Sequence, residues 1–368
     1  MKKWFCLLML IIIAIVSIGC NSKRKLFLLN WGDYIDEELV DEFEEIYNVR
    51  VINDPVDSNE SMYSRLKDKV SPYDIIFPSD YMIEKMHNEN LLKKIDYAQL
   101  ANYSDGMFVD ELEEIMATDL CKTYQDYYIP YFWGALGIMY NESKEGVKEA
   151  VEEHGFKVFF EQNLLPKGSK VGMYNASRDA FAAAQLYLGY SLNTKNEEEL
   201  KNCADLLRKT NFSAWGTDDL KKSVAVGNLD VALVYSGDFF DMWYSYDENE
   251  KEINFNMYVP TTANNVFFDA IVIPISSRAT DLAYKFIDFM IDHEKSMQNA
   301  LYVGYCPTIQ GVYDAILEDE EMAEIVEMDA YHPTLVVKGA KEKAEVYANL
   351  GKETYEVVER LFNTVKQK

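Results

Sequence analysis

The 368-residue chain has few of the side chains that metal centres and many nucleophilic sites require. Its four histidines, His87, His154, His293 and His332, are scattered along the sequence. There is no HExxH helix, no Cys/His spacing suited to zinc, no glycine-rich phosphate loop and no GxSxG elbow. Catalysis therefore has no support in the sequence. We expect a protein that is not an enzyme and that uses no metal and no cofactor.

Cysteine is also scarce, which argues against a fold held together by disulfides. Of the five cysteines, Cys6 and Cys20 lie in the N-terminal segment. Cys121, Cys203 and Cys306 are far apart in the sequence, and an odd number of cysteines cannot all pair. Stability must then come from a hydrophobic core, and a chain of this length can build its core in two domains.

Positive charge is the third shortage. The sequence has 36 lysines and arginines against 62 aspartates and glutamates, which gives a formal net charge of −26. Such a surface repels nucleic acid and anionic lipid, and it attracts cations. We therefore exclude nucleic acid as a partner of this protein.

The N-terminus carries an apolar run that is shorter than the ~20 residues of a membrane-spanning helix. The segment MKK is positive, residues 4–18 are almost wholly apolar, and small residues directly precede Cys20. This pattern resembles the bacterial lipoprotein signal. It predicts a signal peptide over residues 1–19, a lipid on Cys20 and a tether over residues 20–24. The protein would be exported and anchored to the cell membrane, facing the periplasm or the extracellular side. A plain secretory signal or an uncleaved anchor is the alternative.

Apolar periodicity alternates between strands and helices in the first hundred residues. We expect strands over 25–31, 49–56 and 73–79, followed by helices over 36–48, 58–70 and 81–92. The first helix has Asp36 as its N-cap and one apolar face made of Leu39, Val40, Phe43, Ile46 and Tyr47. This alternation is typical of a mostly parallel sheet covered by helices on both faces. In such sheets ligands bind beyond the carboxyl ends of the strands.

The same alternation returns in the second half of the chain. We expect strands over 169–175, 229–238 and 264–275, and helices over 177–190, 282–302 and 354–365. At three places an aromatic and an acidic residue stand together at an expected strand end: Trp31, Asp33 and Tyr34; Tyr235 and Asp238; Phe267 and Asp269. Each group alone is ordinary in a turn or a helix cap. Their recurrence in an acidic, exported chain favours a shared site for a cation.

Several longer motifs occur in the order found in a known family. The stretches NWGDY, SNESMYSRL, YDIIFPSDYMIEKM, IPYFWGALGIMYN, VYSGD, FFDAIVIP and VGYCPT resemble the bacterial spermidine/putrescine-binding proteins, the receptors of polyamine ABC importers. The resemblance implies a type II periplasmic-binding-protein fold of two α/β lobes, each a mostly parallel sheet flanked by helices. Lobe 1 would hold residues 25–135 with 269–313, and lobe 2 residues 136–268 with 314–368. The ligand would lie between the lobes, and an ABC permease with its ATPase would be the partner.

The family's polyamine site carries over residue by residue onto this sequence. The implied set is Trp31, Asp33, Tyr34, Ser79, Tyr81, Asp179, Thr217, Tyr235, Asp238, Phe267, Asp269 and Tyr305. Tyr235 and Phe267 stand where the spermidine receptors have tryptophan, and Ala176 stands where they have a second carboxylate. Asp33 and Asp238 instead resemble the acidic set of the putrescine-type receptors. The preference between putrescine and spermidine therefore stays open.

A polyamine suits this set because it combines methylene groups with terminal ammonium groups. Aromatic faces cover methylenes and attract cations, while carboxylates bind the amines. A sugar site would instead place Asn, Gln and Arg beside the aromatic residues. Two alternatives remain: a surface polyamine sensor, and a binding protein for another small cationic solute.

Overall fold

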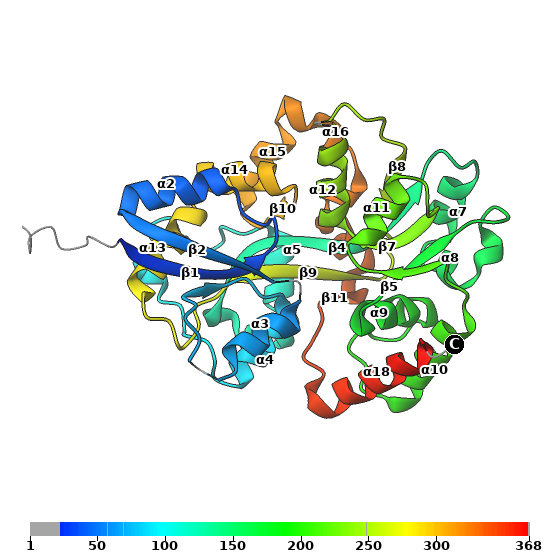
Figure 1. Ribbon diagram of the computed structural model, residues 1–368, viewed down its shortest axis with the longest axis horizontal. Coiled ribbons are helices and arrows are strands. Elements are labelled where there is room, and N and C mark those ends of the chain that lie inside the picture. Colours follow the sequence, from blue (N-terminus) through cyan, green and yellow to red (C-terminus); the bar gives the residue numbers. More distant parts are fainter. Residues whose placement is uncertain (1–22, 57, 69, 248, 367–368) are drawn as a thin grey trace, which may run out of the picture.

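The computed structural model describes residues 23–366 except 57, 69 and 248, so the predicted signal peptide and the lipidated Cys20 lie outside the described residues. Among the described helices, none is long and apolar enough to cross a membrane. Two lobes lie side by side, and strands β4 and β9 run between them (Figure 1). The two-lobe α/β fold expected from the sequence is confirmed.

The first lobe contains a parallel sheet with strand order β2-β1-β3. Its strands and the helices that follow them are β1 (Arg24–Trp31), α2 (Glu37–Tyr47), β2 (Val49–Val56), α3 (Asn59–Leu66), β3 (Ile75–Ile76) and α4 (Asp80–Asn88). The predicted alternation is therefore correct, although the third strand is much shorter than expected. Arg24, which we assigned to the tether, is instead the first residue of β1, where it pairs with Val49.

Helix α2 shows where periodicity succeeds and where it fails. Asp36 caps the helix as predicted, because its side chain accepts a hydrogen bond from the Glu38 N–H at 2.9 Å. Ile46, however, is 56% exposed, so its predicted place on the buried face is wrong. Glu44 is buried instead, because its carboxylate accepts a 2.7 Å hydrogen bond from the Val51 N–H of β2.

The second sheet has strand order β11-β9-β4-β7-β5-β6, with β8 and β10 also paired to β4. Its strands are β4 (Ile129–Asn141), β5 (Val171–Tyr174), β6 (Ala214–Gly216), β7 (Val231–Tyr235), β8 (Phe255–Tyr258), β9 (Asn264–Ile271), β10 (Cys306–Pro307) and β11 (Ala344–Glu345). Strand β5 is parallel to β6 and β7, whereas β4 is antiparallel to β7, β8, β9 and β10.

Strand β4 connects the two lobes. Its residues 129–135 pair with β9, and Leu136–Tyr140 pair with β7. The predicted lobe boundary at 135/136 falls where β4 changes its partner. The division of the whole chain into lobes at the predicted positions stays a prediction, and this change of partner supports it.

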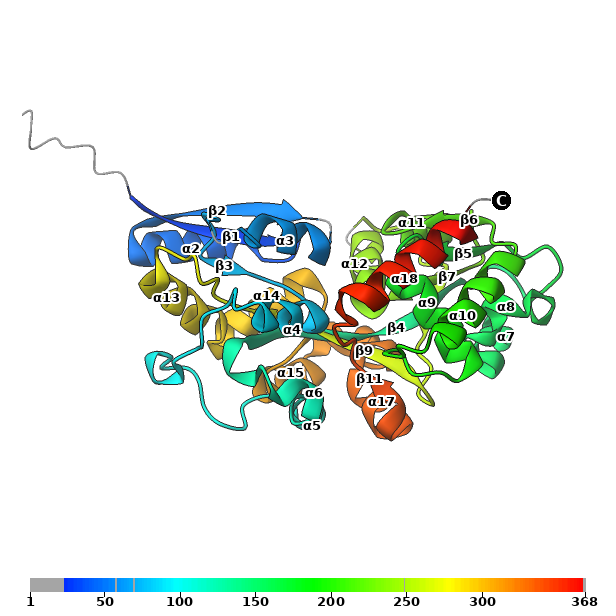
Figure 2. The same ribbon diagram turned by 90° about the horizontal axis from the view of Figure 1, so that it is seen from below.

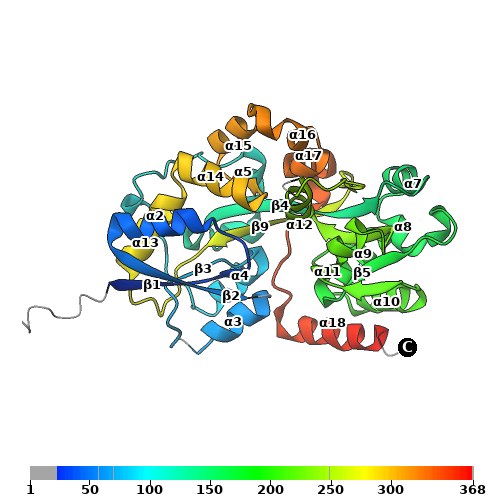
Figure 3. The same cartoon turned by 45° about the horizontal axis from the view of Figure 1, so that its top comes forward.

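The remaining helices cover both sheets (Figure 2). They are α5 (Asp110–Met116), α6 (Asp119–Lys122), α7 (Val147–His154), α8 (Lys157–Phe160), α9 (Ser177–Leu188), α10 (Glu197–Lys209), α11 (Asp219–Ala225), α12 (Ser236–Asp247), α13 (Thr280–Met290), α14 (His293–Val303), α15 (Gln310–Leu317), α16 (Ala323–Val326), α17 (Pro333–Ala340) and α18 (Gly351–Val365). After β11 the chain runs down to α18, which lies along α10 in the second lobe (Figure 3).

The helix predicted over 282–302 is two helices, α13 and α14. The helix is interrupted before α14, where Asp292 is the N-cap residue. Its carboxylate accepts hydrogen bonds from the N–H groups of Glu294 and Lys295 at 3.0 and 3.3 Å. The apolar pattern continues across the break, so periodicity alone did not reveal it. The N-cap residue decided the boundary.

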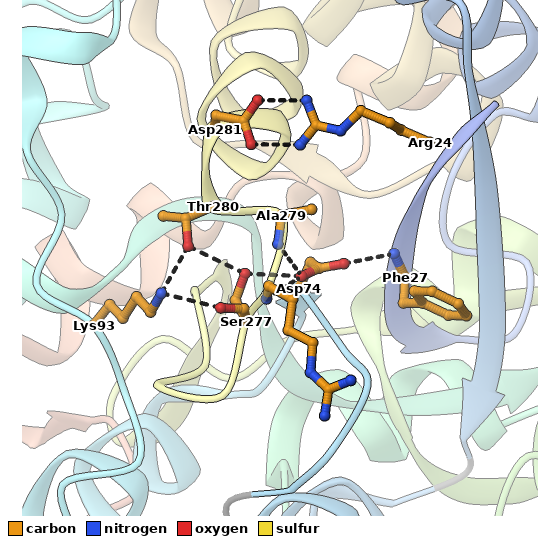
Figure 4. A network of polar contacts seen from close by, with 9 residues as sticks. Arg24, Phe27, Asp74, Lys93, Ser277, Ala279, Thr280 and Asp281 are labelled. Carbon is orange, nitrogen blue, oxygen red and sulfur yellow. Dashed lines mark hydrogen bonds and ion pairs between the residues drawn. The ribbon is translucent and has the colours of Figure 1, made fainter. Parts of the chain in front are cut away.

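A buried carboxylate joins β1 to the start of α13 (Figure 4). Asp74 is 2% exposed, and its Oδ1 accepts hydrogen bonds from the Ser277 hydroxyl and from the N–H groups of Arg278 and Ala279 at 2.8–2.9 Å. Its Oδ2 accepts a hydrogen bond from the Phe27 N–H at 3.2 Å. These bonds hold β1 in place, and the far end of β1 leads into the predicted site.

The three cysteines within the described residues are free and buried. The expected absence of a disulfide framework is therefore what this part of the chain shows. Its stability rests on a continuous apolar core that includes β4, β7 and β9.

Candidate functional site

A cleft of about 1160 Å³ lies between the two lobes, at the carboxyl ends of strands from both sheets. Every residue of the predicted polyamine set lines it: Trp31, Asp33, Tyr34, Ser79, Tyr81, Asp179, Thr217, Tyr235, Asp238, Phe267, Asp269 and Tyr305. Residues that are up to 274 positions apart in the sequence are thereby brought to one place. The structure contains no ligand, so their contact with a polyamine stays a prediction.

The turn after β1 forms one wall of the cleft. Trp31 is half-buried and donates a hydrogen bond from Nε1 to the Phe77 carbonyl at 2.8 Å, which fixes its ring. Asp33 is exposed and has a left-handed backbone conformation with φ of 45°. Tyr34 is buried and donates a hydrogen bond to Asp269 Oδ2 at 2.6 Å. The turn therefore directs its phenol into the cleft and leaves Asp33 at the rim.

Aromatic rings form a continuous line through the cleft. The ring centroids of Tyr34 and Tyr305 are 5.1 Å apart, and those of Tyr305 and Phe267 are 6.4 Å apart. Phe267 is 5.0 Å from Tyr235, which is 5.8 Å from Tyr174. Each pair is edge-to-face, the arrangement that aromatic rings prefer. The line gives the cleft an apolar wall with π faces.

Two glycines make room for this line of rings. A Cβ atom at Gly237 would lie 2.1 Å from the Tyr305 ring, and one at Gly134 would lie 2.8 Å from the Phe267 ring. Neither distance is possible for a real side chain. The motifs VYSGD and YFWGALG thus contain glycine where an aromatic ring packs directly on the backbone.

Asp269 is a buried carboxylate, and one of its two oxygens accepts no hydrogen bond from the described residues. It is 6% exposed, and its Oδ1 has no hydrogen-bond partner among the described residues. Burial raises the pKa of Asp269 from its ordinary value of 3.8 to about 6, and the hydroxyls of Ser79 and Tyr34 oppose this rise. We expected Asp269 at the start of its strand, but it lies two residues before the end of β9. Its free oxygen can accept a hydrogen bond from a cation.

Asp179 is the second carboxylate in the cleft, in the first turn of α9. Its Oδ1 accepts hydrogen bonds from the Tyr235 hydroxyl and, at 3.3 Å, from the Tyr347 hydroxyl. Burial raises the pKa of Asp179, and these two hydroxyls oppose the rise. The Ala176 N-cap of α9 also lines the cleft.

Asp238 differs from the other two because a lysine neutralises it. The Lys221 ammonium lies 3.3 Å from Asp238 Oδ1, and it also pairs with Asp218 and Asp241. Burial raises the pKa of Asp238, and Lys221 opposes the rise. Burial alone would lower the pKa of Lys221, but the negative charges of Asp238 and Asp241 outweigh it and raise that pKa. Asp238 lies in the first turn of α12, because β7 ends at Tyr235 and not at Asp238 as we predicted.

The polar members of the set are placed by their neighbours. Ser79 receives a 3.0 Å hydrogen bond on its hydroxyl from the Asn59 amide, and its own N–H donates to Asn59 Oδ1 at 3.0 Å. The Tyr81 hydroxyl donates to Glu60 Oε1 at 3.2 Å. Thr217 is exposed, and its N–H donates to Asp219 Oδ1 at 2.8 Å. Of these, Ser79 is the nearest to Asp269, with which it forms an isolated β-bridge.

Sequence reasoning missed several residues that line the cleft: Asp80, Tyr174, Arg178, Lys221 and Tyr347. Asp80 is fully buried and accepts a 2.6 Å hydrogen bond from the Tyr81 N–H, and burial raises its pKa well above the ordinary value. The guanidinium of Arg178 lies 4.4 Å from the centre of the Tyr347 ring. Asp80 directly follows a predicted strand and Tyr174 lies near the end of another, so both could have been found by that signal. Lys221 and Tyr347 carry no such signal.

The chemistry of the cleft suits a ligand that is both apolar and positively charged. Acidic side chains outnumber basic ones in its lining. Asp269 is buried and Asp179 is half-buried beside aromatic rings, where a cation restores the charge balance.

The family model of the bacterial extracellular solute-binding proteins matches residues 38–330. The chain belongs to this family. It is therefore an extracytoplasmic solute-binding protein and not an enzyme.

Three relatives of this solute-binding protein are informative. The substrate-binding protein PotD of a spermidine/putrescine ABC transporter from Streptococcus pneumoniae is 32% identical; its structure covers 93% of this chain and 98% of its own, with a TM-score of 0.73. The TpPotD lipoprotein of Treponema pallidum is 27% identical. The match covers 94% of this chain and 100% of the Treponema chain, with a TM-score of 0.75. The spermidine/putrescine-binding periplasmic protein of Escherichia coli is 26% identical over 83% of this chain and 84% of its own length.

Proposed function

We propose that this solute-binding protein captures a polyamine, putrescine or spermidine, in its interlobe cleft and delivers it to the permease of an ABC importer. The observation that carries the proposal is the buried Asp269 carboxylate, whose Oδ1 has no partner among the described residues. It lies in a cleft walled by aromatic rings. A buried carboxylate without a partner is costly, and an ammonium group removes that cost.

The rings and the carboxylates act on different parts of the ligand. A cation over an aromatic face gains about 0.5–2 kcal/mol. A hydrogen bond to a charged group contributes about 1.5–3 kcal/mol, and each buried methylene about 0.8 kcal/mol. A ligand that lacks one amine leaves a carboxylate unpaired, so the site rejects it more strongly than a ligand with one methylene too many.

The roles of the predicted residues follow from their positions. Asp269 and Asp179 bind the ligand amines, because both carboxylates line the cleft and Asp269 Oδ1 has no partner among the described residues. The aromatic set covers the methylenes: Trp31, Tyr34, Tyr81, Tyr235, Phe267 and Tyr305. Ser79 and Thr217 supply polar contacts, and Asp33 attracts the ligand at the rim.

The relatives support a polyamine as the ligand. The Streptococcus and Escherichia proteins carry spermidine and putrescine in their names, and the first is 32% identical over nearly the whole chain. The cleft of about 1160 Å³ is larger than a polyamine of this size needs. We infer that the lobes, 25–135 with 269–313 and 136–268 with 314–368, close on the ligand and that the permease recognises the closed form.

The lipid anchor belongs to the same proposal. The pattern of residues 1–20 supports removal of residues 1–19 and lipidation of Cys20, and the related Treponema protein is a lipoprotein. A polyamine receptor held at the outer face of the membrane stays close to its permease, which raises its effective concentration there. The predicted attachment is tested by mass spectrometry of the mature N-terminus, with Cys20→Ala as the unlipidated control.

The proposal is tested by a thermal-shift panel of putrescine, cadaverine, spermidine, spermine, common sugars and amino acids. A ligand present at a hundred times its Kd stabilises the folded state by about 2.7 kcal/mol, which is a clear shift in Tm. We expect the amines alone to produce it. Asp269→Asn should weaken binding at least tenfold in calorimetry, whereas Asp314→Asn, an exposed change on α15, should not. A shift with a sugar or amino acid and none with any polyamine would overturn the proposal.

A further inference from the structure

Lys221 is a buried lysine inside a cleft that selects for amines. It lies on α11 and is 6% exposed, although lysine is rarely buried without a charged partner. Its Nζ lies 2.7 Å from Asp218 Oδ1, 2.8 Å from Asp241 Oδ2 and 3.3 Å from Asp238 Oδ1. The three N–H donors of the ammonium therefore each have a carboxylate within reach.

Both carboxylate oxygens of Asp238 have hydrogen-bond partners. Besides Lys221, the Tyr305 hydroxyl lies 3.4 Å from Oδ1, and the Tyr174 hydroxyl donates to Oδ2 at 3.3 Å. Asp269 presents the opposite case, because its Oδ1 has no partner within the described part of the chain. The two carboxylates line the same cleft, yet only Asp269 has an oxygen free for a ligand amine.

We propose that Lys221 is a built-in ammonium group that occupies the Asp238 end of the cleft and thereby restricts recognition to the ligand amines bound at Asp179 and Asp269. Lys221 is a specificity-determining residue in this proposal, which rests on the proposed polyamine function. A diamine keeps its full affinity when Lys221 is paired with Asp238, because its two amines bind at Asp179 and Asp269. The third amine of a triamine finds the Asp238 carboxylate already paired.

The lysine is held firmly enough to stay when a ligand enters. Asp218 and Asp241 approach it from the solvent side, with side chains 59% and 50% exposed, while Asp238 lies deeper in the cleft. Helix α11 packs against α12, which carries both Asp238 and Asp241. A ligand amine would have to break contacts to three carboxylates to replace Lys221, and it would form a contact to one.

The first test compares two ligands on the wild-type protein. Spermidine is putrescine with an aminopropyl group on one nitrogen, and N-propylputrescine is the same molecule without the terminal amine. Calorimetry at 0.15 M salt, where long-range attraction is screened beyond about 8 Å, should give Kd values within about threefold of each other. Spermidine bound more than tenfold more tightly than N-propylputrescine would overturn the inference.

The second test removes the built-in ammonium. In Lys221→Gln the Asp238 carboxylate is open, so spermidine should gain at least tenfold over N-propylputrescine. Lys222→Gln is the matched control: it removes the same charge from the same helix, but the exposed Lys222 ammonium reaches Asp218 at 3.4 Å and is not paired with Asp238. The control should keep the wild-type ratio. An unchanged ratio in a folded Lys221→Gln protein, or an equal change in both variants, would overturn the inference.

The outcomes separate this inference from the function on which it rests. A wild-type protein that binds none of the amines overturns the proposed function and the inference together. A wild-type protein that binds both amines but strongly prefers spermidine overturns the inference alone. If Lys221→Gln does not fold, as circular dichroism would show, the comparison on the wild-type protein decides by itself.

Discussion

Affinity for a polyamine should fall as the pH is lowered through about 6, because Asp269 must be ionised to bind an ammonium group. Burial raises the pKa of Asp269 to about 6. At pH 5 roughly one tenth of the free protein carries the charge. Binding of putrescine, whose amines stay protonated throughout this range, should therefore weaken roughly tenfold between pH 7 and pH 5. Tenfold corresponds to about 1.4 kcal/mol of binding free energy.

The same pKa shift acts on stability in the opposite sense. The folded chain holds the Asp269 proton more tightly than the unfolded chain, in which the ordinary value of 3.8 applies. Stability from this group is thus present below about pH 4 and is lost as the pH rises through about 6. The loss is about 3 kcal/mol at neutral pH. A bound polyamine places a positive charge beside the ionised Asp269 and should restore the stability that is lost at neutral pH.

The assay is calorimetry of putrescine binding at pH 5, 6, 7 and 8, together with Tm of the free protein. Asp269→Asn should bind weakly and lose most of the pH dependence. Asp80, Asp179 and Asp238 also have raised pKa values, so a smaller slope should remain in the variant. Equal wild-type affinity at pH 5 and pH 8 would refute the role of Asp269.

Three further perturbations test other features of the fold and the cleft. Gly237→Ala places a Cβ atom 2.1 Å from the Tyr305 ring and should weaken putrescine binding at least tenfold, whereas Gly311→Ala on α15 should not; equal affinity in both would contradict the packing argument. Ala176→Asp adds a carboxylate at the N-cap of α9 and should raise Tm, and in calorimetry it should raise the preference for spermidine over putrescine. An unchanged ratio of the two affinities would show that this position does not set the preference. Asp74→Ala leaves one buried and two partly buried N–H groups without their acceptor and should lower the free energy of unfolding in urea by about 3–5 kcal/mol; a loss below about 1 kcal/mol would argue against the network of Figure 4.

Local signals in the sequence were sufficient for much of the fold. Alternating apolar patterns and the Asp36 cap predicted β1, α2 and β2, because each depends on residues within one turn or one strand. The single helix predicted over 282–302 was wrong, since its apolar pattern continues through the cap at Asp292. Ile46 was misplaced because periodicity cannot show that Glu44 is drawn inward by a backbone N–H of β2.

The candidate site could be predicted in position but not in charge state. Trp31 ends β1 of the first sheet, and Tyr235 and Asp269 lie in β7 and β9 of the second, so the strand pattern placed each residue near a strand end. Their meeting in one cleft depends on how the two lobes face each other, which the strand pattern does not show. Whether a given carboxylate is free depends instead on side chains that arrive from other elements. The Tyr347 hydroxyl donates a hydrogen bond to Asp179 from 168 residues away in the sequence, and no local sequence pattern predicts that bond.

Asp238 shows most clearly why a matching motif does not fix a binding role. VYSGD places this carboxylate in the cleft, but its partner Lys221 stands in DDLKKS, which has the composition of an ordinary solvated helix face. Lys221 becomes buried because α11 and α12 pack side by side, so that two carboxylates of α12 and the neighbouring Asp218 surround its ammonium. Our proposal therefore predicts that two chains that share the acidic motif differ in the number of amines they bind when only one of them has a lysine at the position of Lys221. In the proposed site, selectivity depends on the carboxylate oxygens that have no partner, and these are fewer than the acidic residues that line the cleft.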